Sequence, residues 1–364
     1  MKILHIVEDF SVKSGGLRTV IANLDFFLKK HGYDSYILSS DQEKEDDIFI
    51  VEASNGWLYS KEWKPKINHI VKTYHIDIIH IHGVWLCPQY VGAKYAVQNN
   101  IPLVFSCHGM YQPWLWKKGT LKKKIYLNLV SKKWFKKANI IHSITDNETK
   151  NIKKYFPKNS YFEIPNLISF SENSNEFKAD GKYIFYLGRL NKTKGIDILI
   201  KAFAQLNNKN IQLKIAGGFN EYKAELDKLV HELGLSERVS FLGEVKGNEK
   251  TKLIREAWVM ASPTFSDVIG MVNLEAALNK TPMITTHKTG LKEGWNTNGG
   301  YLINPNIKEL TAKLKEAISW NAEERKLKGE QLYEFAKQNY SWSEQFYKWE
   351  ELYTSILKNK VHVK

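Results

Sequence analysis

The chain has 364 residues, of which 43% are hydrophobic, and a formal net charge of +14 at pH 7. This length and hydrophobic content exclude a single small core and a disordered chain, and they favour two globular domains. No apolar run approaches the length of a membrane helix, and the short, acid-containing first segment is not expected to be a signal peptide. Cys87 and Cys107 are not spaced as a metal-ligand pair, so we expect a reducing, cytoplasmic location without disulfides.

A βαβ unit is predicted at the start of the chain. Lys2–Val7 is typical of a buried strand, and it is followed by a glycine turn, a helix over Leu17–Lys30 and a second strand over Asp34–Ser39. This order is typical of a doubly wound parallel sheet, but the turn lacks the G-x-G-x-x-G pattern of nicotinamide-binding proteins. Gly15 and Gly16 either let a bound group approach the backbone closely or simply form a tight turn, and the residues leave both open.

Two further predicted strands, Asp77–His82 and Pro102–His108, each end in histidine followed by glycine and large aromatic side chains. Functional groups in doubly wound sheets gather at the carboxyl ends of the strands. His108 is therefore a candidate site residue, although a single histidine is more often structural. The aromatic side chains that follow the two strands either belong to the same site or pack in the core.

Lysines are concentrated between these strands and the next one. No acidic residue occurs between positions 77 and 146, whereas nine lysines lie within Lys117–Lys137. We predict one basic amphipathic helix over Leu121–Lys137, which could bind an anionic membrane leaflet or pack on the domain with a solvated lysine face. Nucleic-acid binding is not expected, because Trp134 and Phe135 fall near the apolar side of this helix rather than among the lysines.

The polar segment Ser169–Lys182 is predicted to be a linker between two domains. After it, a predicted strand over Tyr183–Leu187 runs into the turn Gly188–Gly195 and then into a helix. Arg189 and Lys194 lie in this turn. Two cations at a strand-to-helix turn suit a diphosphate, with Arg as a planar fork and Lys as a point charge. On their own, two surface cations in a loop would be unremarkable.

A loop and a short helix within Ser262–Ile284 carry two acidic residues. The helix is predicted to begin at Gly270 and to end before Pro282, so that Asp267 lies in the loop and Glu275 in the second turn. The exposed N–H groups of a helix N-terminus suit a phosphate, and ionised carboxylates accept hydrogen bonds from hydroxyl groups. Phosphate and hydroxyl groups together describe a nucleotide sugar, and the alternative is a capped helix with two surface acids.

Four segments resemble motifs of one known family. They are Gly188–Gly195, with the pattern G-R-L-x-x-x-K-G, Ser266–Ala276, close to S-E-x-F-G-M-V-x-x-E-A, His80–Trp85, with H-x-H-G-x-W, and His108–Trp114, close to H-G-M-L-x-P-W. These patterns resemble retaining glycosyltransferases of family 4 with the GT-B fold. Within that family they are similar to the branch assigned to bacterial surface polysaccharides, namely O-antigen, capsule and exopolysaccharide. The chain departs from the patterns at Asp267 (usually Glu), Ile269 (commonly Phe) and Tyr111 (usually Leu).

The resemblance covers nearly the whole chain and implies an α/β GT-B architecture, with two Rossmann-like doubly wound parallel-sheet domains facing a cleft. It implies an acceptor domain over residues 1–168, the linker over 169–182, and a nucleotide-sugar domain over 183–340. A C-terminal helix within 341–364 is expected to pack back on the first domain. No metal or other cofactor is expected, because the nucleotide-diphosphate sugar is a co-substrate and this fold family handles the leaving charge without an essential metal.

The resemblance also implies roles for individual residues. Arg189 and Lys194 are expected to neutralise the leaving diphosphate, Glu275 to hold the ribose hydroxyls, and Asp267 to hold sugar hydroxyls. His108 is expected near the transferred sugar. The remaining donor contacts implied are Gly15, Gly16, Gly188, Gly218, Val245, Ile269, Gly270, Met271 and Val272. The acceptor pocket is expected near Trp85, Tyr111 and Trp114, since tryptophan faces stack on sugar rings, and the alternative for these residues is core packing.

The sequence therefore predicts a hexosyltransferase that moves a sugar from a nucleotide diphosphate, UDP being the commonest, to a glycan or a polyprenyl-diphosphate-linked saccharide. We expect it in the cytoplasm, with the inner face of the plasma membrane as a peripheral site through Lys117–Lys137. Two alternatives remain open. One is another GT-B sugar-nucleotide enzyme, such as an epimerase that releases free sugar, and the other is a basic membrane- or nucleic-acid-binding protein on a degenerate scaffold.

Overall fold

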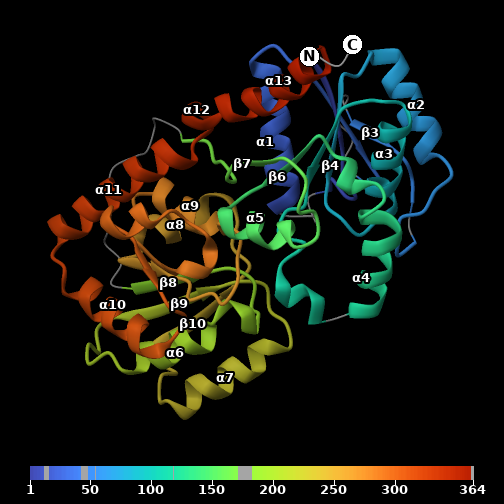
Figure 1. The fold of residues 1–364 in the computed structure, drawn as a ribbon. Coiled ribbons are helices and arrows are strands. Elements are labelled where there is room, and N and C mark those ends of the chain that lie inside the picture. Colours follow the sequence, from blue (N-terminus) through green and yellow to red (C-terminus); the bar gives the residue numbers. More distant parts are fainter. Residues whose placement is uncertain (12–15, 42–47, 54, 118, 171–182, 362–364) are drawn as a thin grey trace. The chain divides into compact units, whose positions relative to one another are not determined.

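The computed structural model describes the chain except for residues 12–15, 42–47, 54, 118, 171–182 and 362–364. The chain forms two compact units (Figure 1). Unit 1 comprises Met1–Leu167 and Gln345–Lys364, and unit 2 comprises Ile168–Glu344. Most of the predicted linker, together with Gly15, lies outside the described residues.

In the described part of unit 1, seven strands form one parallel sheet in the order β3-β2-β1-β4-β5-β6-β7. Most residues of the central strands β1, β4, β5 and β6 are buried, as is usual for a parallel sheet that helices cover on both faces. Most of these residues are apolar, and the buried polar exceptions are histidines and serines. The strands are β1 (Lys2–Ile6), β2 (Asp34–Ser39), β3 (Ile48–Ile50), β4 (Ile78–His82), β5 (Leu103–Ser106), β6 (Ile140–Ser143) and β7 (Tyr161–Glu163).

The helices of unit 1 pack against this sheet through apolar stripes. On α1, for example, Val20, Leu24 and Phe27 lie on one buried face at the spacing of an amphipathic helix. The helices are α1 (Gly16–Lys30), α2 (Trp63–Tyr74), α3 (Cys87–Gln98), α4 (Thr120–Tyr126), α5 (Asp146–Lys153) and α13 (Tyr347–Val361).

The prediction of one continuous helix over Leu121–Lys137 is wrong. Helix α4 ends at Tyr126, and a π-helical turn over Leu127–Ser131 and a 3-10 turn over Phe135–Lys137 follow it. The wider π-turn keeps Leu127 and Ser131, four residues apart, both on the buried side, and Phe135 then packs on Phe105 with 4.7 Å between ring centroids. Core packing at these positions thus overrides the regular α-helical period.

Three apolar side chains of this predicted amphipathic helix are exposed. The exposed fractions are 73% for Leu121, 50% for Ile125 and 67% for Leu129. The alternative in which this apolar face packs on the domain is therefore wrong for these three residues. They lie instead at a surface that also carries lysines.

Unit 2 repeats the doubly wound plan with a sheet of six parallel strands among its described residues, in the order β10-β9-β8-β11-β12-β13. The order reverses between β8 and β11, and such switch points are where ligands bind in open α/β sheets. The strands are β8 (Tyr183–Leu187), β9 (Gln212–Ala216), β10 (Val239–Gly243), β11 (Val259–Ala261), β12 (Met283–Thr286) and β13 (Tyr301–Ile303).

Helix α6 of unit 2 contacts α7 and α10, and α9 contacts α8 and α11, so that the sheet lies between two helical layers (Figure 1). Side-chain caps fix several helix starts, such as the capping box of Asn321 and Glu324 on α11. The helices are α6 (Ile196–Ala204), α7 (Tyr222–Glu232), α8 (Gly247–Glu256), α9 (Met271–Leu278), α10 (Ile307–Ser319), α11 (Ala322–Tyr340) and α12 (Trp342–Gln345). No helix in the described ranges is long and apolar enough to span a bilayer.

Helix α13 follows unit 2 in the chain but packs in unit 1. Its Tyr353 hydroxyl lies 2.8 Å from His80 Nδ1 on β4, and its Glu350 accepts a 3.0 Å hydrogen bond from the Tyr33 hydroxyl. The helix begins at Tyr347 rather than at the start of the predicted range 341–364, because the short α12 intervenes. Two Rossmann-like parallel-sheet units with a C-terminal helix returning to the first confirm the predicted fold class.

Candidate active site

The carboxyl ends of β8 and β9 meet closely because both are followed by glycine. Gly188 donates its N–H to the carbonyl of Ala216 at 3.0 Å and has φ of +152°. A Cβ on Gly217 would lie 2.1 Å from the Gly188 carbonyl oxygen, so a side chain at position 217 would collide with backbone. A Cβ on Gly218, the next residue, would meet no atom of the described residues within 4 Å. This edge of the sheet is therefore built for close approach to the backbone.

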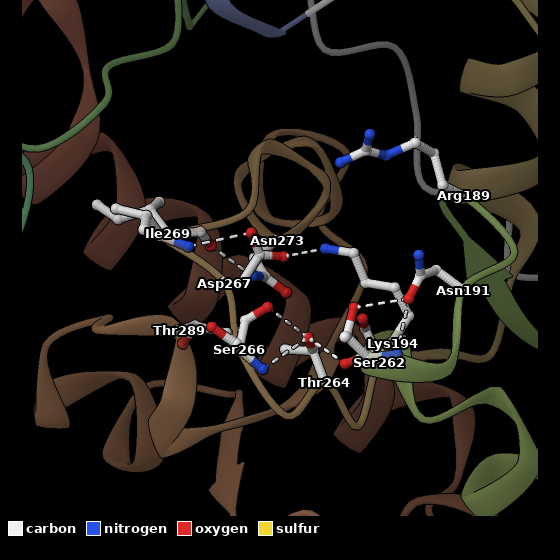
Figure 2. A network of polar contacts seen from close by, with 12 residues as sticks. Arg189, Asn191, Lys194, Ser262, Thr264, Ser266, Asp267, Ile269, Asn273 and Thr289 are labelled. Atoms are coloured by element: carbon white, nitrogen blue, oxygen red, sulfur yellow. Dashed lines mark hydrogen bonds and ion pairs between the residues drawn. The ribbon is translucent and has the colours of Figure 1, made fainter. Parts of the chain in front are cut away.

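The turn after β8 presents its two cations at this edge. The Asn191 side chain accepts a hydrogen bond from Thr193 N–H at 2.9 Å and so begins the 3-10 turn Lys192–Lys194, and Gly195 ends the turn with φ of +68°. Figure 2 shows the side chains of Arg189 and Lys194 directed from this turn toward the segment that holds Asp267.

Lys194 and Asp267 form the central ion pair of the site. Lys194 Nζ lies 2.6 Å from Asp267 Oδ2, and the two side chains are only 20% and 25% exposed (Figure 2). The shorter aspartate, in place of the glutamate of the resembling motif, is thus long enough to reach the lysine. The structure brings together two residues that are 73 positions apart in the sequence.

The loop that carries Asp267 is attached to the β8 turn through its backbone. The carbonyl of Thr193 accepts hydrogen bonds from the hydroxyl of Thr264 at 3.1 Å and from the N–H of Phe265 at 2.8 Å. A Cβ on Gly195 would lie 2.3 Å from the carbonyl oxygen of Pro263, so only glycine fits where the two loops touch. The distance between the acid and the cations is therefore set by main-chain contacts.

The start of α9 is formed by two residues with left-handed backbone. Ile269 has φ of +64° and Gly270 of +62°, and no side chain in the described residues caps the helix. The first N–H groups, including those of Met271 and Val272, are accordingly left for a ligand or water. Asp267 lies beside them, because a Cβ on Gly270 would be 2.8 Å from its Oδ2.

Ile269 is unsuited to direct contact with a donor. Its side chain is 1% exposed, its N–H donates to the Thr289 carbonyl at 2.7 Å, and its carbonyl accepts from Asn273 Nδ2 at 2.6 Å (Figure 2). It instead holds the loop conformation that presents Asp267 and Gly270. The side chain of Val245, after β10, is likewise buried.

Glu275 lies in the second turn of α9, as predicted, and has a basic partner that sequence reasoning missed. Its Oε1 lies 3.1 Å from Lys250 Nζ on α8, and both side chains are partly buried. No local pattern links position 250 to position 275, because the contact depends on how α8 packs against α9.

Unit 1 carries a second cluster of chemical groups, at the carboxyl ends of β4 and β5. His108 follows β5 with φ of +48°, and its Nε2 lies 2.9 Å from His82 Nδ1. The turn after it is held by Glu148, which accepts hydrogen bonds from Gly109 N–H at 2.5 Å and Ile144 N–H at 2.7 Å. Burial lowers the pKa of His108 to about 3, so the imidazole is neutral at pH 7.

The aromatic residues expected at the acceptor pocket have different environments. Tyr111 is 1% exposed, and its ring centroid lies 5.2 Å from that of Tyr155 and 5.7 Å from that of Trp85. For Tyr111 the core-packing alternative therefore describes the structure. Trp85 is half-buried at the border of this cluster. Trp114 is the second residue of the 3-10 segment Pro113–Lys117, and its side chain lies outside the described part.

Four more polar side chains of unit 1 were missed. They are His5 on β1, His142 on β6, Glu8 after β1 and Gln89 on α3. Gln89 donates to the carbonyl of His82 at 2.8 Å and also to Glu8, and burial raises the pKa of Glu8 to about 7. The sequence did offer a signal, because His5 and His142 each interrupt a mainly apolar strand segment. Only the order of the strands in the sheet, however, brings these histidines together.

Among the described residues, His5, His80 and His82 form a group whose ligand atoms lie within 4.8 Å of one another, close enough for a metal ion. Both ring nitrogens of His80 and of His82, and Nδ1 of His5, lie within hydrogen-bond distance of protein groups. Coordination would break several of these hydrogen bonds. The arrangement therefore fits a hydrogen-bonded cluster better than a metal centre.

Models of known protein families match both units of the chain. Residues 14–172 match the family described as Glycosyltransferase Family 4, and residues 168–334 match Glycosyl transferases group 1. The uncharacterized glycosyltransferase MJ1178 of Methanocaldococcus jannaschii is 28% identical over 337 residues, which cover 89% of this chain and 90% of that protein. MJ1607 of the same organism is 37% identical over 115 residues, and this match spans only 29% of its length.

The fold is similar to that of solved structures over nearly the full chain. HepE of Anabaena, solved in complex with UDP and glucose, superposes with a TM-score of 0.74 at 18% identity, covering 98% of this chain and 100% of that one. A Glycosyltransferase Family 4 domain therefore precedes a Glycosyl transferases group 1 domain, and the protein belongs to the glycosyltransferases of the GT-B fold.

Proposed function

We propose that the protein transfers a hexosyl group from a nucleotide-diphosphate sugar, with UDP as the first candidate, to a saccharide acceptor with retention of configuration. The observation that carries the proposal is the convergence of Lys194, Asp267 and the uncapped start of α9 in unit 2. Cations and free N–H groups suit a diphosphate, and a neighbouring carboxylate suits sugar hydroxyls. The complex of HepE with UDP and glucose supports the choice of donor.

The chemistry of the leaving group explains why these residues belong together. A nucleoside diphosphate departs with growing negative charge, and groups oriented in advance stabilise that charge without reorganisation. Arg189, Lys194 and the N–H groups of Met271 and Val272 would supply this stabilisation, so the proposal needs no metal ion. When the diphosphate takes Lys194 as its partner, Asp267 becomes available to a sugar hydroxyl.

Glu275 would hold the ribose of the donor. Two hydroxyl groups can donate to one carboxylate, and the Lys250 ammonium group, 3.1 Å away, orients this carboxylate. Gly188 and Gly218 would allow the nucleotide to approach the strand ends closely. His108 would contribute from unit 1, near the transferred sugar.

Thermal unfolding with a panel of nucleotides tests the proposal. We expect UDP, or one of GDP, dTDP, ADP and CMP, to stabilise the protein by about 2.7 kcal/mol at a hundredfold excess over Kd, with NAD inactive. The shift should vanish in Glu275→Gln and persist in Glu249→Gln, which changes an exposed acid on the neighbouring helix. Stabilisation by none of the nucleotides, or an equal shift in Glu275→Gln, would contradict the donor assignment. Product analysis separates a transferase from an epimerase that releases free sugar.

We further propose that the acceptor is carried at an anionic membrane, as expected for a polyprenyl-diphosphate-linked saccharide used in surface polysaccharide synthesis. The exposed Leu121, Ile125 and Leu129 lie in a segment rich in lysine and free of acidic residues, and this combination supports peripheral binding. The protein should cosediment with vesicles containing anionic lipid at low salt and less so at high salt. A variant with all three apolar residues changed to serine should stay in the supernatant. If this variant sedimented with the vesicles as much as wild type does, the proposal would be contradicted.

A further inference from the structure

Five histidines of unit 1 lie next to one another on adjacent strands. His5 on β1 is the register partner of His80 on β4, and His82 is the partner of Ser106 on β5, which in turn is the partner of His142 on β6. Side chains two residues apart on a strand share one face of the sheet, so His80 and His82 point to the same side. His108, just beyond β5, completes the set.

The first of two hydrogen-bonded chains in this set has a defined direction. The carbonyl of Ile164 can only accept, so His142 Nε2, 2.9 Å away, must carry a proton. A neutral imidazole has one donor, hence His142 Nδ1 accepts from the Ser106 hydroxyl at 2.7 Å. Ser106 then accepts from His80 Nε2 at 2.7 Å, and His80 Nδ1 accepts from the Tyr353 hydroxyl at 2.8 Å. Burial keeps the imidazoles neutral by lowering the pKa values of His80 and His142.

The second chain links His5, His82 and His108. His5 Nδ1 lies 2.9 Å from His82 Nε2, and His82 Nδ1 lies 2.9 Å from His108 Nε2. At the inner end, His5 Nε2 is buried and has no hydrogen-bond partner among the described residues. At the outer end, His108 is the one histidine of the three that is partly exposed. An N–H group at the inner end would therefore have no acceptor, whereas one at the outer end can reach solvent or a ligand.

The orphaned nitrogen of His5 favours one direction for this chain. Buried N–H groups without an acceptor are rarer in proteins than buried acceptors without a donor, so Nε2 of His5 should be the bare nitrogen. His5 then donates from Nδ1 to His82, and His82 donates from Nδ1 to His108 Nε2. His108 consequently carries its proton on Nδ1, the ring nitrogen for which no partner is found in the described residues.

We propose that His82 and His5 are positioning residues that fix the tautomer of His108, so that it presents an Nδ1–H donor at the carboxyl edge of the unit 1 sheet. The donor would serve an acceptor oxygen of the bound sugar, an assignment that rests on the proposed glycosyl transfer. The left-handed backbone at His108 and the hydrogen bond from the N–H of the next residue, Gly109, to Glu148 hold the ring in place. Glu148 is itself fixed by the N–H of Ile144, after β6. His82 and His5 act through His108 and do not touch the substrate.

The tautomer can be measured directly in the full-length protein by imidazole ¹⁵N–¹H correlation NMR after selective labelling of histidine. We expect His108 and His82 both protonated at Nδ1 at pH 7.5. Protonation of His108 at Nε2 would overturn the proposal. This measurement needs no substrate, so its outcome is independent of whether the protein is a transferase.

Two variants at position 82 test the consequence for turnover. His82→Leu removes the donor to His108, whereas the Asn side chain of His82→Asn retains an N–H group close to the place of Nδ1. Loss of one hydrogen bond should lower kcat about tenfold in His82→Leu, with nucleotide-induced stabilisation unchanged because the diphosphate is assigned to unit 2. His82→Asn should recover most of the rate. Equal kcat values for His82→Leu and His82→Asn, with both variants folded and binding nucleotide, would overturn the positioning role of His82.

Zinc titration of the wild-type chain tests the remaining explanation, which is that His5, His80 and His82 bind a metal ion. Binding of one Zn²⁺ per chain that is lost in His5→Leu would show that the histidine cluster is a metal site, and it would overturn the proposal that His5 and His82 position His108. Absence of saturable binding, together with the expected NMR result, supports it.

Discussion

Changing Lys194 to methionine is expected to reduce turnover by about 10²- to 10³-fold, the loss typical of removing one preorganised charge-stabilising group. Methionine keeps most of the length of the side chain but removes the charge that lies 2.6 Å from Asp267 and would face the leaving diphosphate. The loss should be measured as kcat of sugar transfer, with the donor found in the nucleotide panel. Stability should change by only about 1 kcal/mol, because the ion pair is partly solvated.

Lys192→Met provides the matched control for this variant. Lys192 lies in the same 3-10 turn, but its Nζ pairs with Glu225 at 2.7 Å on the surface, where both side chains are more than half exposed. Its loss should leave turnover close to that of wild type. Arg189→Ala should resemble Lys194→Met. If Lys194→Met and Arg189→Ala were both as active as the control, the diphosphate would have to bind elsewhere.

Unit 1 is expected to lose stability in weak acid, well before unit 2. Burial lowers the pKa of His5 to about 3 and that of His142 to about 4, and it lowers the pKa values of His80 and His82 well below 6.5. Below pH 6.5 the unfolded chain takes up protons that the folded chain cannot, so stability falls as the pH falls. Each such group costs about 1.4 kcal/mol per pH unit in this window.

Two carboxyl groups in the same unit oppose this effect. The raised pKa values of Glu8, about 7, and of Glu148 mean that the folded chain holds these protons more tightly than the unfolded chain. These four histidines and His108, whose pKa burial also lowers, outnumber the two acids by three. The net loss is therefore at least about 4 kcal/mol per pH unit, a large part of the stability of a typical domain. In unit 2 the carboxyl groups with lowered pKa values are Glu309 and Glu316, so the loss of stability in acid should begin only near their usual value of 4.5.

Hydrogen exchange read by mass spectrometry between pH 7.5 and 5, corrected for intrinsic exchange rates, would report the two units separately. Peptides from β1, β4 and β6 should lose protection before those from β8 and β11. His69→Gln, a change at an exposed histidine on α2, should leave the profile unaltered. Equal protection of unit 1 at pH 7 and pH 5.5 would mean that the histidines are not kept neutral by burial.

Local patterns were sufficient to predict much of unit 2. The strand, glycine turn and helix around Gly188–Gly195 depend on neighbouring residues, as does the position of Asp267 before α9 and of Glu275 within it. Backbone conformation at such turns is decided over a few residues, mainly by glycine and by short polar side chains. The regular alternation of strands and helices likewise predicted two doubly wound sheets.

The segment after β5 shows where local patterns failed. The lysines and the spacing of Leu121, Ile125 and Leu129 predicted one amphipathic helix, whose apolar face would lie on a membrane or pack on the domain. The structure instead buries Leu127 and Phe135 and leaves those three exposed. Which apolar residues are buried was decided by the space available against Phe105 and its neighbours, and sequence periodicity carries no information about that space.

What the sequence by itself determined is the set of local elements and the chemical groups on them, because short-range backbone preferences act within a few residues. Only the tertiary structure decided which distant groups meet. Strand order places His5 beside His80, the packing of α8 on α9 pairs Lys250 with Glu275, and α13 returns Tyr353 to β4. These contacts join residues 25 to 273 positions apart, and they form because sheet topology and burial of apolar surface bring them together.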